Sequence, residues 1–97
     1  MLAEALVCLA LNVYYEARSQ SIVEQIAVAQ VVINRVNDDR YPNTICEVVK
    51  QGEKNPDGTM KEDRCQFSWY CDGAKDKPYN EKSWELALSV ARSVRDG

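Results

Sequence analysis

Apolar residues recur at helical spacing in several segments, and this periodicity constrains the fold more than any other feature of the chain. Between residues 2 and 18, successive apolar residues are separated by steps of four, three and four, which places them on one face of a helix. Residues 81–95 show a similar pattern behind Asn80, a residue type that caps helices. The sequence therefore predicts a mainly α fold. The first apolar stripe consists of Leu2, Leu6, Leu9 and Val13.

The segment that follows Ser21 carries the strongest helix signal. Glu24 stands three residues after Ser21, which is the spacing of a capping box. Because valines widen its apolar row, we expect this helix to be buried on most of its sides. Asn34 and Arg35, late in the helix, either reach a groove or tie the helix end to the following loop. The apolar row consists of Ile22, Ile26, Ala29, Ile33 and Val36, widened by Val28, Val31 and Val32.

The middle of the chain is more polar. Thr44 and Glu47 repeat the capping-box spacing and predict a short helix that ends near Gln51. Residues 52–64 are strongly polar, and residues 55–58 read Asn-Pro-Asp-Gly, a sequence typical of a turn. We therefore expect either a loop or a short hairpin here.

Length and charge set further limits. A chain of 97 residues suits one domain, so we expect residues 1–97 to form a single mainly α unit with an irregular or hairpin middle. The formal net charge is −3, and no basic stripe indicates a nucleic-acid partner. The apolar opening is too short and too polar for membrane insertion, and it lacks the basic start of a signal peptide.

The chain contains no histidine. Serine triads with histidine, Cys-His pairs and histidine-containing zinc sites therefore cannot be built from this chain alone. Carboxylates become the leading candidates for proton transfer near neutral pH, because Lys and Tyr titrate much higher. We expect neither a metal nor another cofactor.

The four cysteines leave two alternatives open. Cys8, Cys46, Cys65 and Cys71 allow three fully paired connectivities. One or two disulfides suit a protein that works outside a reducing compartment, whereas buried free thiols suit one that works inside it. Cys65 and Cys71 are close enough in sequence to close a small loop.

Glu16 is the first candidate for a catalytic residue, because it continues the apolar stripe of the first helix. A carboxylic acid that donates a proton near neutral pH needs a raised pKa, and apolar surroundings provide it. The alternative is a structural glutamate paired with Arg18 or another base. No second acidic residue is marked by its spacing, which favours chemistry with one acid/base residue.

Residues 65–73 are rich in aromatic side chains, and we expect this segment to be extended or irregular. Phe67 and Trp69 can stack on sugar rings, while Gln66 and Ser68 can hydrogen-bond to sugar hydroxyls. The alternative is that the aromatic side chains fill the core of a small domain.

Four motifs in order resemble the SleB/CwlJ family of cell wall hydrolases, which includes spore-cortex lytic enzymes and phage endolysins. They cover nearly the whole chain, and it is their combination and order that carries the resemblance. The motifs are YYEAR at residues 14–18, QIAVAQVVINRV at 25–36, YPNTIC at 41–46 and CQFSW at 65–69.

The resemblance implies a lysozyme-like domain that cleaves peptidoglycan between N-acetylmuramic acid and N-acetylglucosamine. It implies lytic transglycosylase chemistry with Glu16 as the single acid/base, acting on the bacterial cell wall or spore cortex as a monomer. It further implies that substrate contacts come from the motif residues Tyr15, Gln66, Phe67, Ser68 and Trp69.

Two alternatives to this function remain: a muramidase that hydrolyses the same bond, and a peptidoglycan-binding domain without catalysis. Family members usually continue past the last helix with a further segment that contains glycine and aromatic residues, whereas this chain ends at Gly97. A domain shortened at its C-terminus is one explanation of this difference.

Overall fold

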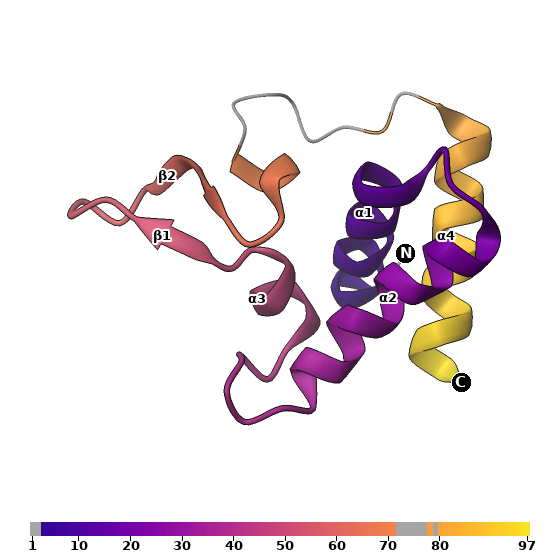
Figure 1. The fold of residues 1–97 in the computed structure, drawn as a ribbon, viewed down its shortest axis with the longest axis horizontal. Helices are drawn as coiled ribbons and strands as arrows, with labels where there is room; N and C mark the ends of the chain where they lie inside the picture. Colours follow the sequence, from indigo (N-terminus) through magenta and orange to yellow (C-terminus); the bar gives the residue numbers. More distant parts are fainter. Residues whose placement is uncertain (1–2, 72–77, 79) are drawn as a thin grey trace.

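The structure is a computed structural model that describes residues 3–71, 78 and 80–97. Leu2, at the start of the first predicted stripe, and Gly73, at the end of the aromatic segment, lie outside the described residues. Helices dominate, and a single antiparallel hairpin projects from them (Figure 1). The mainly α prediction is therefore confirmed. In chain order the elements are α1 (Glu4–Ala17), α2 (Ile22–Val36), α3 (Ile45–Val49), β1 (Gly52–Lys54), β2 (Met60–Cys65), the 3-10 helix η1 (Ser68–Cys71) and α4 (Glu81–Asp96).

Three helices begin where the sequence places a capping side chain. The Ser21 hydroxyl accepts a hydrogen bond from the Glu24 N–H, and Thr44 accepts one from the Glu47 N–H. The Asn80 side chain accepts one from the Ser83 N–H at 2.9 Å. Each cap satisfies a backbone donor that the first helical turn leaves unpaired. These predicted helix starts are confirmed.

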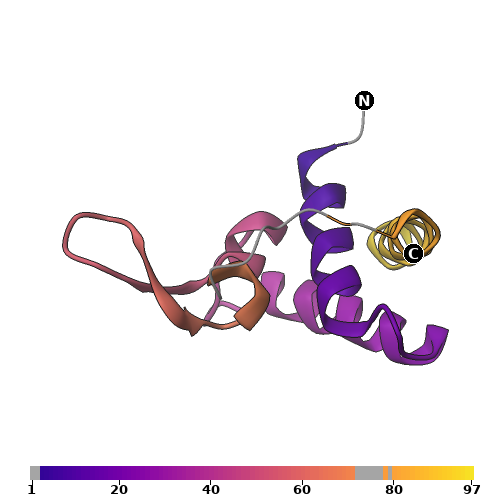
Figure 2. The same cartoon turned by 90° about the horizontal axis from the view of Figure 1, so that it is seen from above.

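Helix α1 lies at the centre of the fold, in contact with α2, α3 and α4 (Figures 1 and 2). The described residues of its predicted apolar stripe, Leu6, Leu9 and Val13, are buried, and its other faces contribute buried residues as well. The fully buried set includes Leu9, Ala10, Val13 and Tyr14. Because Glu16 belongs to the last turn of the same helix, the core fixes the backbone that carries this side chain.

Helix α2 corrects one prediction. Its row of β-branched residues predicts burial on most sides, but only one face packs against α1 and α4. At about 100° per residue, Ala29 and Val32 lie on that face, whereas Val23 points away from it. Apolar composition alone does not show how many neighbours a helix has. The exposed apolar residues are Ile22 (54%), Val23 (75%), Ile26 (41%) and Val31 (41%).

The polar middle segment forms the hairpin that was one of the two predicted alternatives. Strand β1 pairs with β2 in antiparallel register, with Gly52 opposite Cys65 and Lys54 opposite Met60. Gly58 has a φ of 91°, a backbone conformation that residues with a Cβ rarely adopt. The turn is closed by the Asn55 N–H, which donates to the Thr59 carbonyl at 2.7 Å.

Both pairs of cysteines form disulfides. Cys8–Cys46 joins α1 to α3, with Cα atoms 5.3 Å apart, and Cys65–Cys71 closes a short ring, with Cα atoms 6.0 Å apart. Six extended residues would span about 20 Å, so the chain inside this ring has to turn. That requirement explains why residues 68–71 form one turn of 3-10 helix instead of the extended or irregular backbone that we predicted.

Candidate active site

Glu16 lies beside a hollow of about 320 Å³ that is walled by three separate parts of the chain. Helix α1 contributes Glu16, and α2 contributes Val28 and Val31. The segment between β2 and η1 contributes Gln66 and Phe67. The hollow therefore combines one carboxyl group, an aliphatic wall, an amide and an aromatic ring.

The geometry of α2 explains the aliphatic wall. At about 100° per residue, Val28, Val31 and Arg35 share one flank of this helix, at the edge of its buried face. The exposed surface of Val31, which appeared anomalous for a valine, thus belongs to the wall of the hollow. Neither valine was predicted to be a site residue, although the helical projection of α2 was the signal that could have located them.

Nothing neutralises the Glu16 carboxylate within the described part of the chain, where it has neither a hydrogen-bond nor an ion-pair partner. The predicted alternative was a pair with Arg18, but the Arg18 guanidinium donates to the Tyr14 hydroxyl at 3.0 Å and lies over the Tyr14 ring. The side chain is exposed at the mouth of the hollow, yet partial burial raises the pKa of the Glu16 carboxyl above its ordinary value. Desolvation disfavours the charged form and therefore retains the proton to higher pH.

This raised pKa predicts a measurable effect on stability. A folded-state pKa above the unfolded value means that deprotonation of Glu16 opposes folding. The cost is absent below the unfolded pKa of about 4.3 and develops as the pH rises through the folded-state value. We therefore expect Glu16→Gln to raise the Tm at pH 7 and to leave it unchanged at pH 3.

Thermal unfolding across this pH range, with Glu85→Gln on the exposed face of α4 as the matched control, checks the prediction. A Tm difference for Glu16→Gln that is the same at pH 3 and pH 7 would contradict it, because an uncharged structural effect does not titrate.

Trp69 is buried, with an exposed fraction of only 7%. Its indole N–H donates to the Asn12 side-chain oxygen at 2.8 Å, and Asn12 is fully buried in α1. Its ring stacks on Tyr15, with centroids 5.1 Å apart and planes 18° apart. Trp69 therefore occupies the core, which was the alternative weighed for the aromatic segment.

The Trp69–Asn12 bond predicts a loss of stability on substitution. Trp69→Phe removes the donor and leaves the Asn12 oxygen buried and unpaired, which costs about 1–3 kcal/mol in the free energy of unfolding. Urea unfolding measures the loss, with Trp84→Phe as the control, because no hydrogen bond to the Trp84 indole is found in the described residues. We expect Asn12→Leu to recover part of the loss in the Trp69→Phe background. Equal losses for Trp69→Phe and Trp84→Phe would contradict the assigned bond.

Arg35 both reaches the hollow and ties the end of α2 to the following loop, which were the two alternatives that the sequence left open. Its guanidinium carbon lies 5.2 Å from the centroid of the Tyr41 ring and 5.5 Å from that of Phe67. Tyr41 belongs to the loop after α2, and Phe67 belongs to the wall of the hollow. Arg35 thus ties the helix end to the loop and holds one side of the site through cation–π contacts.

The structure separates the predicted site residues into two groups. Gln66 and Phe67 join Glu16 at the hollow, whereas Tyr15 and Trp69 stack on each other and do not line it. Ser68 is exposed at the start of η1 and does not line this hollow.

The described residues contain neither a metal-binding cluster nor a membrane-spanning helix. No group of three or more His, Cys, Asp or Glu side chains among them is arranged to hold a metal ion. None of the helices they form is long and apolar enough to cross a membrane.

Comparison with known proteins identifies the family. The profile described as cell wall hydrolase matches residues 19–97. That region begins three residues after Glu16 and contains the rest of the hollow, from Val28 on α2 to Phe67. No curated protein and no solved structure matches the chain. Because the matched region is most of its length, the chain belongs to the cell wall hydrolase family, whose members are enzymes acting on peptidoglycan.

Proposed function

We propose that this chain is a peptidoglycan lytic transglycosylase of the SleB/CwlJ type, with Glu16 as its single acid/base. The observation that carries the proposal is the Glu16 carboxyl, which has no partner in the described part of the chain and lies beside an aliphatic and aromatic hollow. A partly desolvated acid that is not locked in an ion pair is suited to give and then retake a proton near neutral pH.

The proposed reaction starts with protonation. Glu16 donates its proton to the oxygen that joins N-acetylmuramic acid to N-acetylglucosamine, and the bond from that oxygen to C1 of the muramoyl sugar breaks. The leaving strand keeps the proton as a hydroxyl group. Glu16 is now a carboxylate that faces a sugar with developing positive charge at C1.

Ring closure completes the reaction. The Glu16 carboxylate takes the proton from the C6 hydroxyl of the muramoyl sugar, and the C6 oxygen bonds to C1 to give a 1,6-anhydro product. The enzyme returns to its protonated state, so the reaction needs no hydrolytic water, second carboxylate or cofactor. This agrees with a sequence in which no second acidic residue is marked.

The walls of the hollow supply the proposed substrate contacts. We assign ring stacking to Phe67 and hydrogen bonding to Gln66, because both lie beside Glu16. Ser68 is exposed next to them and is proposed as a polar contact at the edge. Tyr15 and Trp69 are proposed to act indirectly, by holding α1 and the η1 segment in position through their stacked rings.

Product analysis tests the proposal. Purified murein is digested with the protein, and the soluble fragments are analysed by mass spectrometry. We expect fragments with 1,6-anhydromuramoyl ends, which lack one water relative to hydrolysed ends. Reducing ends would replace the proposal by a muramidase reaction, and sedimentation with murein without release of fragments would replace it by a binding domain.

A further inference from the structure

A second hollow adjoins the candidate active site at the base of the hairpin. It has a volume of about 320 Å³ and is lined by Gln51, Gly52, Arg64, Cys65 and Gln66. Gln66 also lines the hollow of Glu16, so the two spaces share a wall. The Gln66 N–H donates to the Gln51 carbonyl at 2.9 Å, which joins the hairpin base to the end of α3.

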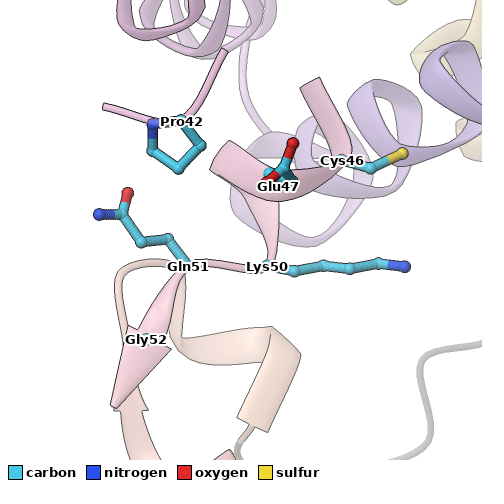
Figure 3. Close-up of a pocket in the computed structure, with 6 residues that line it drawn as sticks. All are labelled: Pro42, Cys46, Glu47, Lys50, Gln51 and Gly52. Atoms are coloured by element: carbon cyan, nitrogen blue, oxygen red, sulfur yellow. The ribbon is translucent and has the colours of Figure 1, made fainter. Parts of the chain in front are cut away.

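A third hollow, of about 430 Å³, continues beyond Gln51 and Gly52 along α3. In Figure 3, the Gln51 side chain points toward Pro42, whereas Lys50 extends the other way, below Cys46. The three hollows form a series from Glu16 to α3 in which each shares at least one lining residue with the next. A polymer bound at Glu16 therefore has a lined path along which an attached group can extend.

Among the polar groups on this path that have no partner within the described residues, two lie at the hairpin base. Arg64 is exposed and makes no hydrogen bond or ion pair within the described residues, and the Gln51 side-chain oxygen is buried and unpaired there. An unpaired guanidinium favours a carboxylate, and an unpaired amide oxygen favours an N–H or O–H donor. By contrast, the Glu47 carboxylate in the third hollow already accepts a hydrogen bond from Thr44.

We infer that the hollows at the hairpin base bind the carboxylate-bearing peptide attached to the muramoyl sugar of the strand at Glu16. Arg64 pairs with a peptide carboxylate, and Gln51 accepts a hydrogen bond from a peptide N–H. This inference rests on the proposed function, because it places a peptidoglycan strand at Glu16. Further sugars fit the path less well, because N-acetylglucosamine is uncharged and the lactyl carboxyl of a muramoyl sugar is neutral when it is joined to a peptide.

Paired substrates test the inference. The kcat/KM of cleavage is measured on glycan strands that carry peptides and on strands stripped of them, in which the exposed lactyl carboxyl groups have been converted to amides. We expect Arg64→Gln to lower the ratio of kcat/KM between peptide-bearing and stripped strands about 2–5-fold, the range of an exposed ion pair. Arg92→Gln makes the same change on an exposed face of α4 and is expected to leave the ratio unaltered.

A binding measurement gives a second, independent result. Calorimetry with the Glu16→Gln protein compares a disaccharide that carries a tetrapeptide with the disaccharide alone. We expect only the peptide-bearing ligand to bind more weakly after Arg64→Gln or Gln51→Met, and its affinity to fall with added salt.

The outcomes separate the two proposals. Equal losses on both substrates, or no loss on either, would overturn the peptide site and leave the proposed reaction intact. Failure of the unmodified protein to cleave either substrate would overturn the proposed reaction, and the calorimetry would then decide the peptide site.

Discussion

Replacing Glu16 by glutamine is expected to lower the rate of murein cleavage about 10²–10⁴-fold, the usual contribution of a general acid/base group. The substitution keeps the size and polarity of the side chain but removes the proton that the leaving oxygen requires. Because Glu16 is exposed and has no described partner, its removal breaks no contact of the fold. The loss should therefore appear in kcat, while the circular dichroism spectrum stays the same.

The pH dependence of murein cleavage tests whether Glu16 is the acid. For the unmodified protein, we expect cleavage to decline as the pH rises through the raised pKa of Glu16, because the acid form disappears. Glu85→Gln removes an exposed acid from α4 and serves as the matched control. Equal clearing of murein by the Glu16→Gln and unmodified proteins would remove Glu16 from the mechanism, whatever the pH profile.

The second large effect concerns the disulfide between α1 and α3. Removing it as Cys8→Ala/Cys46→Ala is expected to lower the free energy of unfolding by about 4 kcal/mol, because the bridge closes a loop with a sequence separation of 38. Cys65→Ala/Cys71→Ala opens a ring with a separation of only 6 and is expected to cost about 2 kcal/mol. The difference follows from the larger number of unfolded conformations that the longer loop excludes.

Chemical denaturation of the two double variants under identical conditions measures which of them loses more of its free energy of unfolding. The larger loss is a substantial part of the ~5–15 kcal/mol that stabilises a typical domain. A greater loss from the short ring than from the long loop would contradict the entropic account. It would show instead that the ring of residues 65–71 makes native contacts worth more than loop closure.

The sequence predicted helix starts well, because the signals are local. Ser21, Thr44 and Asn80 each accept a hydrogen bond from the backbone N–H of the residue three positions later. The capping pattern in the sequence therefore already contains the two residues that make each contact. The burial of α2 could not be predicted in this way. Val23 resembles a core residue in composition, but its exposure depends on where α1 and α4 lie.

In the candidate site, too, the sequence predicts individual residues but not how they pack together. Glu16 was predicted from its place at the end of an apolar stripe, and Gln66 and Phe67 from their chemistry. Their meeting with Val28 and Val31 was not predictable, because it depends on the packing of α2 and on the loop that follows β2. Phe67 lines the hollow, whereas Trp69 is buried in the core. This difference depends on the 3-10 turn at residues 68–71, which lies inside the ring closed by the Cys65–Cys71 disulfide. The sequence left the pairing of these cysteines open.

The two sides of the hollow differ in how far their residues belong to the hydrophobic core. The helical side belongs to α1 and α2, whose inner faces form part of the core. The opposite side is a small disulfide-closed ring, in which Gln66 is exposed whereas Trp69 and Cys71 are buried. We therefore expect substitutions at Gln66 to alter the proposed substrate contacts without disturbing the core that carries Glu16.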